Sequence, residues 1–182
     1  MKHLEILQQE QVGPEAQEIF EGLKKKIGKV PNLYGTWAHS PVAFKAILEL
    51  EKALDSGFFG PKEIQAMELV ISEVNQCHYC IDAHTIVGKM VGFSEDETLE
   101  IRAASIEDEK LRALTQLTRE ITLKRGRPDD QYVERFFEAG YSKQALVELV
   151  AYVGFMTFNN YLNNLTEVPI DFPKAKSLKD VA

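Results

Sequence analysis

Apolar side chains recur at spacings of three and four residues along most of the chain, and no stretch alternates convincingly between apolar and polar residues. This period is that of an amphipathic α-helix, whereas a half-buried strand would alternate. Prolines and glycines mark the ends, because proline is tolerated in the first turn of a helix and glycine often follows its last turn. The pattern predicts helices over residues 14–27, 41–55, 61–74, 77–91, 107–124, 128–140 and 142–164.

The segments between these helices are short. Ser94 and Glu97 have the spacing of a capping box, which predicts one more short helix and brings the number to about eight. Residues 30–40 contain a proline, an asparagine and a glycine and are expected to form a loop. The tail 168–182 contains two prolines and is expected to be irregular. The chain is therefore predicted to be all-α.

One short sequence occurs twice. Met67-Glu68-Leu69-Val70 is similar to Val147-Glu148-Leu149-Val150, and both lie in predicted helices that follow a turn. The repetition indicates either two related helical halves or a chance similarity between amphipathic helices. In either case 182 residues without a linker fit a single domain over residues 1–182.

Composition and charge narrow the possible partners. Hydrophobic residues make up 45% and charged residues 27%, as in ordinary globular proteins. A formal net charge of −7 argues against nucleic acid or an anionic membrane as the main partner, since both need clustered lysine and arginine. No apolar run approaches the roughly 18–20 residues that span a bilayer, and the first residues lack the apolar stretch of a signal peptide. We therefore expect a cytoplasmic protein.

Cys77 and Cys80 are the two cysteines of the chain. Two are too few for the disulfide framework of a small secreted protein, and in a reducing compartment this spacing favours a redox pair or a metal site. Structural zinc usually takes four ligands from two separated pairs, and the chain has one CxxC. Covalent haem attachment needs a histidine directly after the second cysteine, where Ile81 stands. Two buried, inert cysteines remain the alternative to a reactive pair.

Cys77, Cys80 and His84 are spaced so that they share one face of a helix. A thiol in the first helical turn loses its proton more easily, because free N–H groups and the helix dipole stabilise an anion there. His84 lies one turn after Cys80 and can exchange a proton with it or with a departing oxygen. These residues suit a sequence in which the Cys80 thiolate attacks a peroxide, becomes a sulfenic acid, and condenses with Cys77 to a disulfide.

The segment 62–92 resembles the core of the AhpD-like alkylhydroperoxidases, within the carboxymuconolactone decarboxylase superfamily. Cys77, Cys80 and His84 match the family's CxxCxxxH motif position for position. Other segments are similar to a peroxidase-related subgroup of the family. These segments are Val30-Pro31-Asn32-Leu33-Tyr34, His39-Ser40-Pro41, Ala83-His84-Thr85, Asn160-Tyr161 and Ile170-Asp171-Phe172-Pro173.

This resemblance implies an all-helical fold that forms symmetric oligomers. It also implies hydroperoxide reduction by Cys80, resolution by Cys77, and a proton relay through His84 and a glutamate. No bound cofactor is implied, only an external dithiol reductant, of the dihydrolipoamide type, or its carrier protein. The decarboxylases of the superfamily do not depend on such a cysteine pair, so their activity is not carried over.

Two positions depart from the family pattern. The relay glutamate is expected twelve residues before the first cysteine, where this chain has Gln65, and Tyr79 replaces a histidine before the second cysteine. If the helices around Gln76 fold back on each other, residue 68 lies opposite residue 84. Glu68 is therefore our candidate relay carboxylate, with a solvated surface glutamate as the alternative. Glu73 is the rival, but the same pairing places it near Tyr79, away from the histidine.

Two functions follow from these residues. The first is a thiol-dependent peroxidase that reduces hydroperoxides through Cys77 and Cys80. The second is a non-catalytic redox-sensing or oligomeric interaction protein with a regulatory disulfide, which the departures at Gln65 and Tyr79 favour. Peroxide consumption with a dithiol would distinguish them. A homo-oligomer is expected in both cases, because so many amphipathic helices in a 20.6 kDa chain leave apolar faces to bury.

Overall fold

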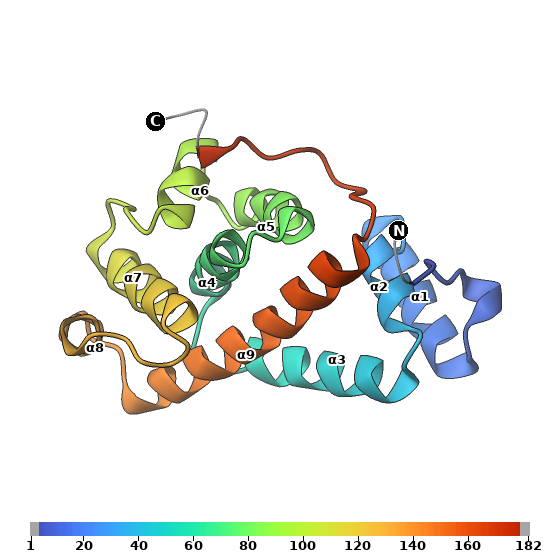
Figure 1. Ribbon diagram of the computed structural model, residues 1–182, viewed down its shortest axis with the longest axis horizontal. Helices are drawn as coiled ribbons and strands as arrows, with labels where there is room; N and C mark the ends of the chain where they lie inside the picture. Colours follow the sequence, from blue (N-terminus) through green and yellow to red (C-terminus); the bar gives the residue numbers. More distant parts are fainter. Residues whose placement is uncertain (1–3, 179–182) are drawn as a thin grey trace.

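A computed structural model describes residues 4–178, and within that range every regular element is helical (Figure 1). A 3-10 turn over Gln9–Gln11 precedes nine α-helices. They are α1 (Pro14–Ile27), α2 (Asn32–Trp37), α3 (Pro41–Asp55), α4 (Pro61–Val74), α5 (His78–Met90), α6 (Glu95–Arg102), α7 (Glu109–Leu123), α8 (Asp130–Glu138) and α9 (Lys143–Thr166). The predicted all-α class is confirmed.

Local signals placed most helix ends correctly. Helices α1, α3 and α4 each begin at the proline that marked them in the sequence. The capping box before α6 forms as expected, because Ser94 Oγ accepts the Glu97 N–H at 3.1 Å and Glu97 Oε2 accepts the Ser94 N–H at 2.7 Å. These bonds satisfy backbone donors that a helix start leaves free.

The prediction of a loop over residues 30–40 was wrong, because this stretch contains helix α2. Pro31 stands at the N-cap, where its fixed φ suits the entry into a helix. Gly35 lies inside α2 and allows a close backbone contact instead of a turn. A Cβ there would lie 2.6 Å from Ile6 Cγ2 and 2.8 Å from the Leu7 carbonyl oxygen. This contact with the N-terminal segment was not visible in the sequence.

Helix α4 occupies the centre of the molecule, with α5, α6, α7 and α9 packed around it (Figure 1). All of its residues from 64 to 72 are buried, and Met67, Leu69 and Val70 are fully so. A helix that is buried on every side must also bury its polar residues, so Gln65 and Glu68 lie in the interior. The fold thus brings a carboxylate into the core beside α5.

Residues 169–177 have no regular secondary structure, as predicted, but hydrogen bonds hold them in place. We call residues 169–176 the strap. It leaves the end of α9, crosses α5 and reaches α6 (Figure 1). The Ala175 N–H donates to Asp82 Oδ1 of α5 at 2.8 Å, and Arg102 Nη1 of α6 donates to the Lys176 carbonyl at 2.6 Å. The last residues of the predicted tail, 179–182, lie outside the described residues.

None of the helices in residues 4–178 is both long enough and apolar enough to cross a membrane.

Candidate active site

A tight turn joins α4 to α5 and sets the geometry of the site. Asn75 closes α4, and Gln76 takes a left-handed conformation with φ of 53°. The Cys77 N–H then donates to the Ser72 carbonyl at 2.9 Å, so that α5 folds back along α4. Cys77 is the N-cap of α5, and Cys80 lies in its first turn.

The two cysteines form a reduced, buried pair. Their sulfur atoms are 2.8 Å apart, which is longer than a disulfide bond and within reach of a thiol hydrogen bond. Cys77 is fully buried, and Cys80 is 3% exposed. Asn163 of α9 donates its amide Nδ2 to Cys80 Sγ at 3.2 Å and lies 4.0 Å from Cys77 Sγ. A buried amide donor therefore faces both sulfurs.

The sulfur pair releases its first proton easily and its second with difficulty. The hydrogen bond with the Cys80 thiol lowers the pKa of Cys77, and the Cys80 backbone amide, the Asn163 amide and the charge of His84 add to this effect against burial. The hydrogen bond with Cys77 and burial raise the pKa of Cys80. The sequence predicted the attacking thiolate on Cys80, whereas these pKa shifts favour ionisation of Cys77 first. The N-cap position of Cys77 and the proton shared between the sulfurs account for the difference.

His84 is held by two polar residues of α4. Its Nδ1 lies 3.1 Å from Glu68 Oε2 and 3.1 Å from Gln65 Oε1. Gln65 in turn donates its Nε2 to Glu68 Oε2 at 2.5 Å. Burial by itself lowers the pKa of His84, but the charge and hydrogen bond of Glu68, together with the charge of Cys77, outweigh it and leave the pKa raised. The imidazolium form is therefore favoured.

The carboxylate that approaches His84 is the one the hairpin geometry had suggested. Glu68 is 6% exposed, which rules out the solvated surface position considered for it. The family's relay position, Gln65, lies one helical turn away and contacts both Glu68 and His84. Glu73 points elsewhere, because its Oε2 accepts a hydrogen bond from Arg102 Nε at 2.8 Å.

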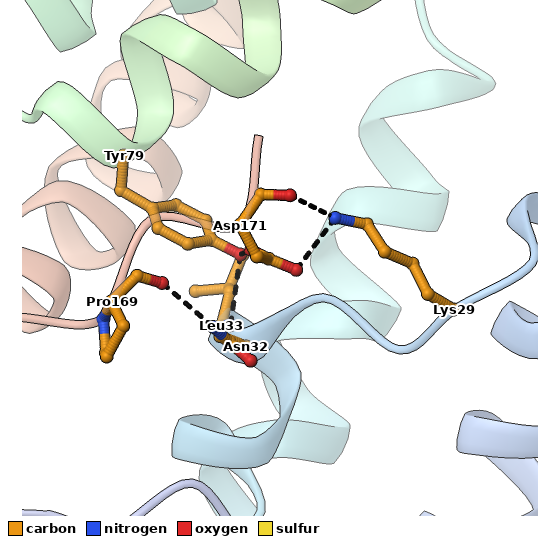
Figure 2. Close-up of polar contacts among 6 residues, drawn as sticks. All are labelled: Lys29, Asn32, Leu33, Tyr79, Pro169 and Asp171. Carbon is orange, nitrogen blue, oxygen red and sulfur yellow. Dashed lines mark hydrogen bonds and ion pairs between the residues drawn. The ribbon is translucent and has the colours of Figure 1, made fainter. Parts of the chain in front are cut away.

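Tyr79, the residue before Cys80, ties α5 to the strap (Figure 2). Its hydroxyl donates to Asp171 Oδ1 at 2.8 Å and accepts the Leu33 N–H at 3.2 Å. Asp171 Oδ2 also pairs with Lys29 Nζ at 2.8 Å. Burial, together with the charge of Asp171, raises the pKa of Tyr79, so this hydroxyl stays protonated and able to donate.

A cavity of about 450 Å³ adjoins these residues. Its walls are mostly apolar and aromatic, and they include Leu33, Tyr34, Trp37, Phe155, Met156 and Phe172. Polar side chains line the rest, and they include Lys26, Lys29, Glu51, Gln65, Glu68 and His84. Burial, Glu68 and Asp55 raise the pKa of Glu51 to about 7. The cavity thus joins an apolar space to a histidine whose pKa is raised.

Cys80 lies on the face of α5 that borders this cavity. Ala83, His84 and Val87 line the cavity, and they follow Cys80 by three, four and seven residues. Residues at these spacings share one helical face. Cys77 precedes the helix and is fully buried, so access favours Cys80.

Asn163 is the site residue that the sequence analysis missed. Asparagine is unfavourable inside a helix, yet α9 holds four of them, Asn159, Asn160, Asn163 and Asn164. Asn160 contacts Asn75 and Ser72, and Asn164 donates to the Asn75 carbonyl, so both secure the turn before Cys77. This run of asparagines was the available signal, but only the packing of α9 on α4 shows which one faces sulfur.

No group of three His, Cys, Asp or Glu side chains within residues 4–178 is arranged to hold a metal ion.

The model of the carboxymuconolactone decarboxylase family matches residues 41–122. This range runs from the start of α3 almost to the end of α7 and includes both cysteines, His84 and Glu68. No curated protein sequence matches the chain.

Several solved structures are similar over most of the chain. A peroxidase-related protein from Ralstonia eutropha with the alkylhydroperoxidase AhpD core is 18% identical, with a TM-score of 0.84 over 92% of this chain and 91% of its own. The debrominase Bmp8 is 18% identical, with a TM-score of 0.79 over 94% and 93%. A peroxidase-related protein from Silicibacter sp. is 19% identical, with a TM-score of 0.75 over 87% and 85%. At these identities the similarity shows a shared fold.

Proposed function

Residues 41–122 belong to the carboxymuconolactone decarboxylase family and the chain has the AhpD-like fold, and from this premise we propose that the protein is a thiol-dependent peroxidase. The reduced sulfur pair beside an apolar cavity and a carboxylate-held histidine is the observation that carries the proposal. A thiolate and a positioned acid are the two groups that reduction of an O–O bond requires.

In the first step the Cys80 sulfur attacks the terminal oxygen of a hydroperoxide. The shared proton moves to Cys77 over the 2.8 Å between the sulfurs, which leaves the thiolate on the residue that borders the cavity. The S–O bond forms as the O–O bond breaks, Cys80 becomes a sulfenic acid, and the departing alkoxide takes a proton from His84 to leave as the alcohol.

In the second step Cys77 displaces hydroxide from the sulfenic acid, and the hydroxide leaves as water with a proton. The product is the Cys77–Cys80 disulfide, which stores the two electrons given to the peroxide. An external dithiol of the dihydrolipoamide type, or a carrier protein that bears one, then returns two electrons and two protons. One of these protons returns to Cys77 and the other to His84, whose imidazolium form Glu68 stabilises.

The experiment is steady-state consumption of an organic hydroperoxide with dihydrolipoamide as reductant. We expect turnover by the wild type, loss of turnover in Cys80→Ser, and a trappable sulfenic acid on Cys80 in Cys77→Ser. Sulfenic acid on Cys77 in the Cys80→Ser variant would instead make Cys77 the attacking residue. A disulfide that forms reversibly without turnover would support the redox-sensing protein over the enzyme.

The cavity supports one further candidate activity, removal of bromine from an aromatic ring. Bmp8 is a debrominase, and a cysteine-to-alanine variant of it has been solved with 2,3,4-tribromopyrrole. The aromatic walls formed by Tyr34, Trp37 and Phe172 suit a flat ring. Release of bromide from a bromopyrrole, with formation of the same disulfide, would favour this activity. Absence of bromide release alongside peroxide turnover would exclude it.

A further inference from the structure

Both sulfurs are buried, and the cavity reaches the face of α5 that carries Cys80, where Tyr79 and Ala83 line it. One side of that cavity is formed where segments outside the core helices meet α5. Lys29, Leu33, Tyr79 and Phe172 contribute to it, and they come from the α1–α2 connection, α2, α5 and the strap. We call these four residues together with Asp171 the strap wall.

Side chains hold the strap wall together (Figure 2). Asp171 joins Tyr79 and Lys29 through its two carboxylate oxygens, and Lys29 also donates to the Asp171 carbonyl. The Phe172 ring meets the Tyr79 ring edge-on at 5.4 Å between centroids, and Lys29 Nζ lies 4.2 Å from the centre of the Phe172 ring. Asn32 fixes the start of the strap by donating to the Pro169 carbonyl at 2.9 Å.

These contacts are individually weak and partly in solvent. The Lys29 side chain is 42% exposed and that of Asp171 22%, and ion pairs with such exposure contribute little to stability. A single aromatic pair adds only a small contribution. Tyr79 belongs to the buried core, and Leu33 and Phe172 pack against it, but the polar contacts of Asp171 are few and partly exposed, so one substitution can loosen the strap wall.

We propose that the strap wall determines the size of the molecules that reach Cys80, with Phe172 as the specificity-determining side chain. Phe172 lines the cavity, and its ring contacts the ring of Tyr79, the residue directly before Cys80. Small hydroperoxides pass with the wall closed, and bulky hydroperoxides or reductants require it to open. The statement about hydroperoxides rests on the proposed function, but the statement about access to the sulfurs does not.

The test compares alkylation of the reduced cysteines by a small reagent, iodoacetamide, and a bulky one, N-(1-pyrenyl)maleimide. In Phe172→Ala we expect the rate with the maleimide to rise tenfold or more and the rate with iodoacetamide to change less than threefold. Phe137→Ala is the control, because this exposed phenylalanine lies on α8 against Phe136 and does not line the cavity. It should leave both rates unchanged.

Asp171→Asn provides a second variant that keeps the side-chain volume, and it secures the test if Phe172→Ala fails to fold. It removes the charge that holds Lys29 and should raise the maleimide rate selectively, though less than Phe172→Ala does. An unchanged ratio of the two rates in both variants overturns the proposal. An equal rise in both rates also overturns it, because that result indicates general loosening and not a size limit.

Peroxide turnover gives an independent reading. Phe172→Ala should raise the kcat/KM for cumene hydroperoxide relative to that for hydrogen peroxide by fivefold or more, and an unchanged ratio contradicts the proposal. If the wild type turns over no peroxide, the proposed function fails, while the alkylation ratio still decides the role of the strap wall.

Discussion

His84 receives its carboxylate partner from Glu68, one helical turn beyond the position where the resemblance leads one to expect a glutamate. Gln65 stands where a relay glutamate is expected, and Glu68 takes the place beside the imidazole. The hydrogen bond from Gln65 to Glu68 fixes the carboxylate that faces His84. Residues 65 and 68 of one helix thus supply both polar partners of His84.

Removal of this carboxylate should slow peroxide reduction. In Glu68→Gln the charge that raises the pKa of His84 is lost, so less imidazolium is present near neutral pH to protonate the departing alkoxide. We expect kcat/KM for a hydroperoxide to fall tenfold or more, on the order of a small general-acid contribution. The pKa of His84, followed by NMR titration, should fall in the same variant.

Glu73→Gln is the control, because Glu73 lies on the same helix but pairs with Arg102, and glutamine keeps an acceptor for that contact. Its turnover should match the wild type.

The wild type should lose the part of its stability that comes from His84 as pH rises. A raised folded-state pKa stabilises the fold fully below the unfolded value of about 6.5, and this contribution disappears as pH passes the folded-state value.

Asn163 should stabilise the thiolate of the sulfur pair. Its Nδ2 donates to Cys80 Sγ, while its Oδ1 is buried without a hydrogen-bond partner, so the side chain acts here as a donor. In Asn163→Ala we expect the apparent pKa of the first thiol, measured by thiolate absorbance, to rise by about one unit, the equivalent of one hydrogen bond. Asn164→Ala removes a neighbouring amide that bonds only backbone, and an equal rise there would refute the role of Asn163.

At the scale of elements, the α4–α5 hairpin and helix α2 form the two sides of the site. The hairpin brings Glu68 to His84, and α2 supplies the Leu33 N–H that Tyr79 accepts. Helix α2 is only six residues long, and isolated helices of that length are unstable in water. Its stability must come from packing, and the contact of Gly35 with the N-terminal segment is one source.

Gly35→Ala should therefore destabilise the protein. The new methyl group would overlap the Leu7 carbonyl, which is backbone and cannot rotate away. We expect the free energy of unfolding, from urea denaturation, to fall by about 1–3 kcal/mol, the usual cost of overpacking. Gly22→Ala, on α1 with open space around it, should instead gain up to about 1 kcal/mol from helix propensity. Equal effects of the two substitutions would show that Gly35 tolerates a side chain.

At the scale of the molecule, α9 is apolar on two sides. Its inner side packs against α3, α4 and α7. Its outer side carries a row of exposed apolar side chains at helical spacings, and these are Val147, Val150, Phe158, Tyr161 and Leu165. Such a row on one face of a long helix is typical of a surface that is covered in an oligomer.

A homo-oligomer held through α9 is therefore our expectation for the protein in solution. Leu165→Glu places a charge on a side chain that is 66% exposed in the single chain, so it should weaken association at least tenfold without unfolding the protein. Light scattering over a concentration series measures the change. Leu123→Glu on α7 serves as control. A wild-type monomer at micromolar concentration would refute the expectation.

The sequence by itself determined the helical class and most helix ends, and it singled out Cys77, Cys80 and His84 as a candidate redox site. These features depend on local chemistry: the period of apolar residues, the prolines and capping residues, and the i, i+3 and i+7 spacing of Cys77, Cys80 and His84. The short α4–α5 turn even allowed the pairing of Glu68 with His84 to be inferred, because two helices joined by so few residues must run side by side.

Tertiary structure decided the features that depend on contacts between distant segments. Helix α2 follows from the approach of residues 6 and 7 to Gly35, which no local signal encodes. Asn163 reaches the sulfurs because α9 packs on α4, 83 residues away from Cys80 in the chain. Asp171 of the strap meets Tyr79 across 92 residues. The order of the two thiol pKa values depends on the hydrogen bonds that each sulfur makes in the folded chain. Long-range packing fixes which polar groups become neighbours in a buried space, and a pattern along the chain does not contain that information.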